Sequence, residues 1–174
     1  MVDSEDIFYL VDTNRNNLGK WLPWVKNTNS VEDSMEFVGK SIEEFEKGNR
    51  FEYGLYLEND NDQTKGNLIG AVGLVSVEKD EAEIGYWLSK QREGKGFMVT
   101  AVKELINESQ QVLGLTKFVI KTVENNLKSR RIPEKLGFVE TGFSKEQVIL
   151  DDVPRKLTVY QLVLDQDLNS CTND

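Results

Sequence analysis

The stretch that decides the fold is AEIGYWLSKQREGKGFM, which occupies residues 82–98. Its first seven residues have the period-two pattern and the β-branched and aromatic content of a strand, and they run into a loop that contains Gly94 and Gly96. A helix is expected from about Gly96 to Val112, and residues 117–123 follow as a buried strand. A strand–helix–strand crossover of this kind joins parallel strands with right-handed geometry.

Helical and strand patterns flank the crossover on both sides. A helix is expected at residues 4–18, and a second one starts at a capping box, Ser30 to Asp33, and stops at Gly48. The apolar stripe of this second helix is Val31, Met35, Val38, Ile42 and Phe45. Further strands are expected at 51–57, 68–77, 138–143, 147–150 and 157–164, with a short helix at about 129–136. The order α-α-β-β-β-α-β-α-β-β-β predicts an α/β fold with a mixed sheet.

Length and composition indicate one globular domain. The chain has 174 residues, of which 39% are hydrophobic and 29% charged, and its polar tail starts at about residue 166. A net charge of −9 argues against a nucleic-acid partner and suits either a cationic partner or simple solubility. The acidic beginning and the short apolar runs predict neither a signal peptide nor a membrane partner, so a cytoplasmic protein is expected.

The missing residue types exclude several chemistries. The chain has no histidine, which removes Ser-His-Asp triads, Cys-His dyads and histidine metal sites, and no metal is expected. Its one cysteine, Cys171, lies in the polar tail and can form no disulfide within the chain. Acid–base chemistry therefore falls to carboxylates, tyrosine, lysine or the backbone.

The loop at residues 91–98 has features that favour an anion-binding site. Glycines let a ligand approach the backbone closely, and the first N–H groups of the following helix lack intrahelical partners. The helix dipole adds partial positive charge, which suits a phosphate. Neither the P-loop pattern nor the full dinucleotide fingerprint is present, and a tight strand–helix turn explains two glycines equally well.

Four motifs stand in an order that resembles the GNAT superfamily of N-acetyltransferases: AEIGYWL at 82–88, Gln91-x-x-Gly94-x-Gly96, Asn126-x-x-Ser129, and EKLGF at 134–138. The WLPW segment at 21–24 and AEIGYWL are similar to the RimL-type branch, which acetylates ribosomal-protein serine or alanine N-termini. The resemblance covers roughly residues 6–164. It implies that strands 82–88 and 117–123 separate and leave a slot for acetyl-CoA.

The same resemblance implies the residues that bind the cofactor, and it implies no metal. They are Trp87, Leu88, Gln91, Arg92, Gly94, Lys95, Gly96, Phe97, Met98, Asn126 and Ser129. Basic residues around the slot would add positive charge for the phosphates, or they form an ordinary solvated face; they are Lys90, Arg92, Lys95, Lys128, Arg130 and Arg131.

The resemblance places a catalytic base at Glu83, acting on the amine through water. The alternative is a half-exposed glutamate paired with a lysine of a neighbouring strand. Three family positions are altered. Pro133 replaces a tyrosine acid, and Arg155-Lys156 replaces an acidic or polar pair before the last strand. Val148 replaces a glutamate, with Glu146 two residues earlier as another candidate base. Ser129 is a candidate proton donor, or else a helix cap or a cofactor hydrogen-bond partner.

The sequence thus predicts an acetyl-CoA-dependent N-acetyltransferase that works by direct transfer in a ternary complex. A protein N-terminal α-amine is favoured as acceptor, because its ordinary pKa of about 7.7–8.0 leaves more neutral amine than the lysine value of about 10.4. The alternatives are a small amine, such as a polyamine or antibiotic, and a CoA-binding module with weakened chemistry. Family members usually begin with a strand before the first helix, and only residues 1–3 precede the helix here, so either that strand is absent or its register is unusual. Its absence would expose a sheet edge, which leaves a homodimer open.

Overall fold

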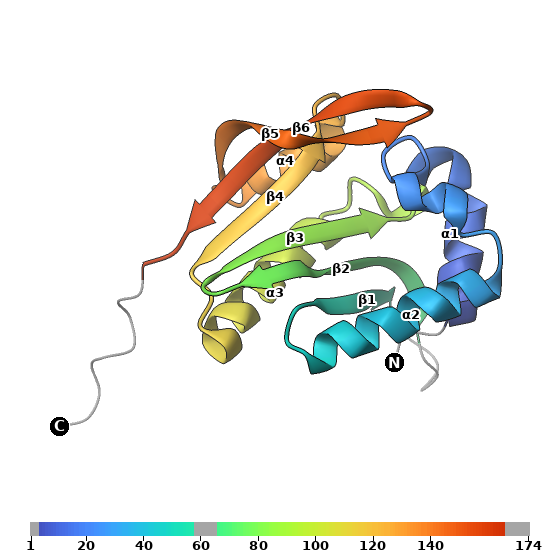
Figure 1. Ribbon diagram of the computed structural model, residues 1–174, viewed down its shortest axis with the longest axis horizontal. Coiled ribbons are helices and arrows are strands. Elements are labelled where there is room, and N and C mark those ends of the chain that lie inside the picture. Colours follow the sequence, from blue (N-terminus) through green and yellow to red (C-terminus); the bar gives the residue numbers. More distant parts are fainter. Residues whose placement is uncertain (1–3, 58–65, 166–174) are drawn as a thin grey trace.

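The structure is a computed structural model that describes residues 4–57 and 66–165, and its core is one mixed six-stranded sheet (Figure 1). The helices are α1 (Ser4–Leu18), η1 (Pro23–Asn27), α2 (Val31–Glu46), η2 (Lys90–Arg92), α3 (Phe97–Leu113) and α4 (Leu127–Lys135). The strands are β1 (Phe51–Leu57), β2 (Asn67–Glu78), β3 (Glu81–Leu88), β4 (Lys117–Val123), β5 (Val139–Leu150) and β6 (Val153–Val163). The predicted α/β fold is confirmed, while the polar tail expected from about 166 lies outside the described residues.

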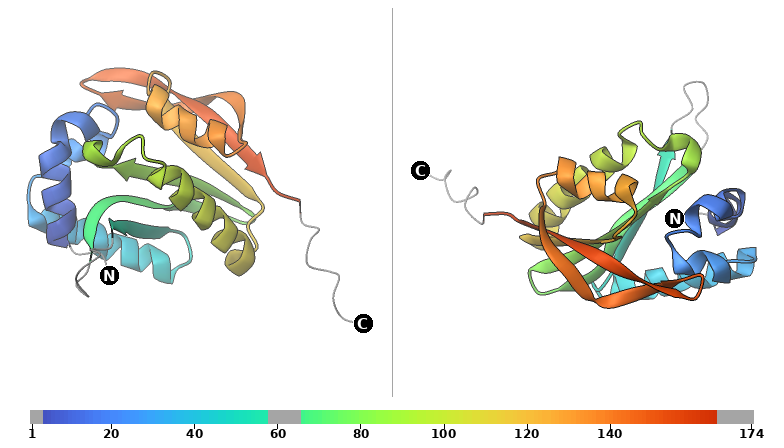
Figure 2. Two further views of the ribbon diagram at one scale, coloured as in Figure 1. Left: turned by 180° about the vertical axis from the view of Figure 1, so that it is seen from behind. Right: turned by 90° about the horizontal axis from the view of Figure 1, so that it is seen from above.

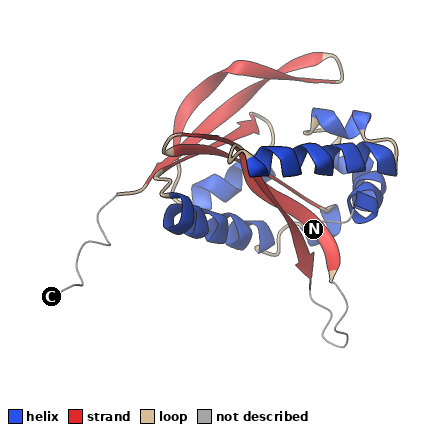
Figure 3. Ribbon diagram, turned by 60° about the horizontal axis from the view of Figure 1, so that its bottom comes forward, coloured by secondary structure: helices blue, strands red, loops and turns tan. Residues whose placement is uncertain are grey.

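Helices cover both faces of the sheet (Figure 2). On one face α3 and α4 pack over the main core, in which Val102 of α3 and Phe118 of β4 are completely buried. On the other face α1 and η1 enclose a smaller cluster around Val11 and Val25. The strands continue between these two groups of helices as one twisted layer (Figure 3).

The capping box of α2 forms as predicted. Ser30 Oγ accepts a hydrogen bond from Asp33 N at 3.3 Å, and the Asp33 carboxylate accepts one from Ser30 N at 2.9 Å. The apolar stripe behind it is less buried than a core-facing helix requires, since Met35 is 59% and Phe45 53% exposed. The sequence correctly predicted the helix, but its stripe packs only partly, against α1 and β1.

The three closing strands expected from the sequence are in fact two, and this part of the prediction is wrong. Residues 144–146 do not form a turn; β5 runs through them, with a shift of its register against β6 between Phe143 and Gln147. The hairpin turn lies at Asp151 and Asp152, whose φ angles of 49° and 60° are ones that aspartate tolerates better than most residues. The last strand consequently starts at Val153 rather than at Leu157.

The parallel strands β3 and β4 are paired over three residue pairs only, from Glu81–Lys117 to Glu83–Val119. Beyond Glu83, β3 stays paired with β2 as far as Leu88, and β4 stays paired with β6 as far as Val123, but not with each other. We call this region the β3–β4 divergence (Figure 1). The sequence predicted that these two strands would separate, and the pairing confirms it.

Strand β1 forms one edge of the sheet and β5 the other; within the described residues, β1 pairs only with β2. Within the same part of the chain, no strand precedes α1.

Candidate active site

The loop between β3 and α3 has the backbone geometry that an anion site needs. Gly94 and Gly96 have φ angles of +77° and +87°, in the left-handed region, and Gly96 is the N-cap of α3. A Cβ atom built on either glycine meets nothing within 4 Å, so the backbone faces open space here. The first N–H groups of α3 therefore stand at an accessible helix N-terminus, which fits a pyrophosphate.

The structure distributes the predicted cofactor contacts along this turn and the start of α4. They are Trp87 and Leu88 at the end of β3, Gln91 and Arg92 in η2, Gly94, Lys95 and Gly96 in the loop, Phe97 and Met98 in the first turn of α3, and Asn126 and Ser129 at the start of α4.

Residues that the sequence did not single out hold the loop in place. Asn14 Oδ1 of α1 accepts a hydrogen bond from Lys90 N at 3.0 Å, and Asn17 Nδ2 donates one to Glu93 at 2.9 Å. Glu93 also forms an ion pair with Lys128 of α4. Both α1 and α4 thus anchor the loop.

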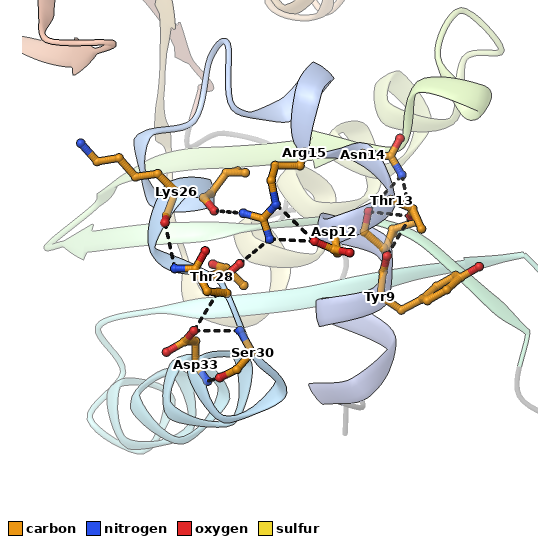
Figure 4. Close-up of polar contacts among 12 residues, drawn as sticks. Tyr9, Asp12, Thr13, Asn14, Arg15, Lys26, Thr28, Ser30 and Asp33 are labelled. Carbon is orange, nitrogen blue, oxygen red and sulfur yellow. Dashed lines mark hydrogen bonds and ion pairs between the residues drawn. The ribbon is translucent and has the colours of Figure 1, made fainter.

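The turn after α1 is fixed by Arg15. Its guanidinium donates to the carbonyls of Val25 and Thr28, each at 2.7 Å, and pairs with Asp12 at 3.0 Å (Figure 4). A pocket of about 290 Å³ lies between this turn and Leu150 of the β5–β6 hairpin. The two segments therefore face each other on the α1 side of the sheet.

The expected basic cluster is less positive than the sequence suggested. Lys128 is paired with Glu93, and Arg130 is paired with Glu140 at 2.9 Å and donates to the Tyr160 hydroxyl at 2.8 Å. Among the described residues, the other four members of the cluster take part in no ion pair, so their charges are available to a phosphate; they are Lys90, Arg92, Lys95 and Arg131.

Ser129 contacts Tyr86, a residue that the sequence analysis gave no role. The Tyr86 hydroxyl donates to the Ser129 carbonyl at 3.0 Å and accepts from Ser129 Oγ at 3.2 Å. Asn126 caps α4 by accepting from Ser129 N at 3.3 Å, so the helix starts at Leu127 and not at Ser129. Burial raises the pKa of Tyr86 above its ordinary value, which keeps the phenol protonated.

Glu83 lies at the last residue pair before the β3–β4 divergence. Because successive side chains of a strand point to opposite faces, Glu83 is on the side of Trp87 and α1, and Tyr86 is on the side of α3 and α4. A carboxylate and a hydroxyl pair thus lie on opposite faces of the sheet, three residues apart along β3.

Both candidate bases share one lysine. Lys121 Nζ is 2.9 Å from a carboxylate oxygen of Glu83 and 2.9 Å from one of Glu146. Burial would lower the pKa of Lys121, but the hydrogen bonds and charges of the two carboxylates outweigh it and raise the pKa. The ion pair with a neighbouring strand, left open as the alternative for Glu83, is therefore present.

The aromatic side chains of the turn after α1 and of α2 are not all brought together by ring contacts; they are Trp21, Trp24, Phe37 and Phe45. Trp24 meets Trp87 edge-on at 6.0 Å, next to the end of β3. Phe45 packs against Phe51 at 5.2 Å, on the α2–β1 side.

Pro133, at the altered family position, lies inside α4, where its carbonyl accepts a hydrogen bond from Phe138 N at 3.0 Å.

Across residues 4–57 and 66–165, no group of three or more acidic or cysteine side chains is placed to hold a metal ion. In the same residues, no helix is long and apolar enough to cross a membrane.

The class of protein that this fold and site define is an N-acetyltransferase of α/β architecture, in which two parallel strands diverge next to a glycine-containing loop at a helix N-terminus. The chain belongs to the acetyltransferase (GNAT) family, whose domain model matches residues 2–139. The resemblance to this family, and to its RimL-type branch, is confirmed.

Named relatives support the assignment. YdaF of Bacillus subtilis (strain 168), named as a ribosomal N-acetyltransferase, is 30% identical over 92% of this chain and 86% of its own length. The ribosomal-protein-serine acetyltransferase of Escherichia coli (strain K12) is 27% identical over 91% of this chain and 86% of its own. The crystal structure of the microcin C7 self-immunity acetyltransferase MccE, in complex with acetyl-CoA and AMP, is 26% identical with a TM-score of 0.82, covering 92% of this chain and 87% of that one.

Proposed function

We propose that this N-acetyltransferase uses acetyl-CoA to acetylate the α-amine at a protein N-terminus, with a ribosomal-protein-like acceptor. The observation that carries the proposal is the position of Glu83 at the β3–β4 divergence, on the sheet face opposite Tyr86 and Ser129. The names of the bacterial relatives support the ribosomal-protein class of acceptor, and the acetyl-CoA complex of MccE supports the donor.

The donor fits the residues present. The open backbone at Gly94 and Gly96 suits its pyrophosphate, and Gln91, Arg92 and Lys95 lie on the same loop. Its pantetheine amides can pair with the edge of β3 at Trp87 and Leu88, which β4 leaves without a ladder partner.

In the proposed reaction, the neutral amine nitrogen attacks the thioester carbonyl and the new C–N bond forms. Glu83 then takes the excess proton of this nitrogen through one water molecule, and the C–S bond breaks. The leaving thiolate takes up a proton on the other face, where Ser129 is the candidate donor and Tyr86 orients it. Ser129 regains a proton from solvent and Glu83 releases its proton to solvent, so both groups return to their starting states. Positioning of the two substrates supplies much of the rate, about 7–11 kcal/mol in favourable cases.

An assay of thiol release separates this proposal from its alternatives. Purified protein and acetyl-CoA are mixed with three acceptors: a peptide with a free N-terminus and no lysine, an N-acetylated peptide with one lysine, and spermidine. Turnover on the first acceptor supports the proposal. Turnover on spermidine alone supports a small-amine enzyme, and CoA binding without turnover on any acceptor supports a weakened CoA-binding module.

The assembly and the location of the protein remain predictions. The edge strand β1 is available for pairing with a second copy, so we propose a homodimer, which light scattering after size exclusion tests directly. We also propose a single domain that works in the cytoplasm.

A further inference from the structure

Lys121 lies among carboxylates at the base of the β3–β4 divergence. A pocket of about 170 Å³ at this point is lined by Ser76, Glu78, Glu81, Ala82, Glu83, Val119 and Lys121. Among these lining residues, three are acidic and Lys121 is the one basic residue. Glu146 of β5 adds a fourth carboxylate next to the lysine, at 2.9 Å.

The exposures show which member of this group is held in place. Side chains of Lys121 and Glu83 are 24% and 30% exposed, whereas that of Glu146 is 72% exposed. Lys121 therefore forms a half-buried pair with Glu83 and a solvated one with Glu146. Its ammonium sits where the positive charge of a protonated amine would otherwise be most favoured, between two carboxylates.

An ammonium at this place changes which amines the site accepts. Lys121 repels a second cation at the position beside Glu83 and compensates the charge of that carboxylate, although Glu78 and Glu81 leave the pocket acidic as a whole. Next to Glu83, a neutral amine is then favoured over a protonated one. At pH 7 roughly one α-amine in ten is neutral, compared with about one lysine side chain in 2,500.

We propose that Lys121 is a specificity-determining residue, which occupies the cation position between Glu83 and Glu146 and thereby favours α-amines over lysine side chains and polyamines. The proposal rests on the proposed function in that Glu83 faces the acceptor. It goes beyond that function by assigning the selection among amines to one side chain of β4.

The test compares Lys121→Met, which removes the charge at similar length, with Lys121→Arg, which keeps it. Lys103→Met is the matched control, because Lys103 is an exposed lysine of α3 on the other face of the sheet. Spermidine binding is measured by calorimetry without acetyl-CoA. The ratio of kcat/KM for the lysine peptide to that for the free N-terminal peptide is measured separately.

We expect Lys121→Met to bind spermidine about tenfold more tightly and to raise the ratio of lysine to α-amine acetylation by about tenfold, which corresponds to ~1.4 kcal/mol. Lys121→Arg and Lys103→Met should match the wild type in both. A folded Lys121→Met with unchanged spermidine affinity and an unchanged ratio overturns the proposal. If that variant does not fold, Lys121→Gln, which keeps hydrogen bonding to the carboxylates, takes its place under the same criteria.

The calorimetric arm needs no turnover. A wild type that is inactive on all three acceptors therefore contradicts the proposed function, while the effect of Lys121→Met on spermidine affinity can still be measured. Conversely, N-terminal acetylation by the wild type and by Lys121→Met with identical selectivity leaves the function standing and removes Lys121 from it.

Discussion

Replacing Gly96 by alanine should weaken CoA binding far more than it weakens the fold. Gly96 has a φ of +87°, and an added Cβ meets no protein atom within 4 Å, so the cost to folding is conformational only. A left-handed residue other than glycine costs roughly 1–2 kcal/mol, of which the lower entropy of the unfolded chain returns about 0.4–1 kcal/mol. The net loss of about 1 kcal/mol lowers the Tm by roughly 2–4 °C for a chain of this size.

The effect on binding comes from a different source. The Cβ projects into the open space where a phosphate must approach the N–H groups of α3, and each hydrogen bond to a charged group contributes about 1.5–3 kcal/mol. Losing one such bond weakens CoA binding by roughly 10- to 100-fold. Titration calorimetry with CoA measures this directly.

The chain offers a matched control in Gly114, the residue after α3. It has a φ of +68°, and a Cβ built there also meets nothing within 4 Å. Gly114→Ala should therefore lose a similar amount of stability and keep its CoA affinity. If both variants bind CoA like the wild type, or both lose affinity equally, the assignment of the phosphate site to the loop is wrong.

Three further outcomes are expected. Glu83→Gln should lower kcat by about 10²–10⁴ at neutral pH and leave CoA affinity unchanged. The loss should be smaller at high pH, where the amine deprotonates unaided. If the variant keeps wild-type rates across pH 6–9, the base is Glu146 instead, and Glu146→Gln tests this. Removing the charge of Lys95 should flatten the salt dependence of CoA binding, and equal dependence in variant and wild type contradicts a phosphate contact. The pKa of Tyr86 is raised in the folded state, so the folded protein keeps this proton to higher pH than the unfolded chain does. The free energy of unfolding therefore falls as pH rises above about 10. Urea unfolding at pH 9–11 should show a smaller fall in this free energy for Tyr86→Phe than for the wild type, and an equal fall argues against a buried phenol.

The sequence predicted the crossover because its signals are local. Two glycines at left-handed positions and a period-two strand before them allow few other arrangements, and both glycines do adopt positive φ. The glycine geometry of the proposed phosphate loop was therefore predictable from the chain alone.

Elsewhere the sequence pattern fits two structures equally well and does not decide between them. The polar residues 144–146 fit a turn, but they also fit an exposed strand with a register shift, which is what β5 forms. The turn lies instead at the two aspartates at 151–152. A charge in an otherwise apolar strand was the signal that could have drawn attention to Lys121.

The contacts of the site lay further out of reach. Tyr86 and Ser129 are 43 residues apart, and Lys121 and Glu146 are 25 apart. Each contact depends on the pairing register of strands and on how α4 packs over them, which no single segment specifies. The candidate base and a lysine partner on a neighbouring strand could be expected from the chain, but the pairing of Lys121 with both Glu83 and Glu146 could not.

The short pairing of β3 with β4 also has a mechanical consequence. Three residue pairs join one half-sheet, β1–β2–β3, to the other, β4–β6–β5. Among the described residues, the positions of β3 beyond Ile84 have no pairing residue in β4. Their amides that point toward β4 should therefore exchange with deuterium faster than their neighbours that point toward β2. A donor bound along the β3–β4 divergence would pair with both strands like a seventh strand and make the two half-sheets move as one rigid body. Slower amide exchange in both β3 and β4 would then report that the donor is bound, before any acetyl group is transferred.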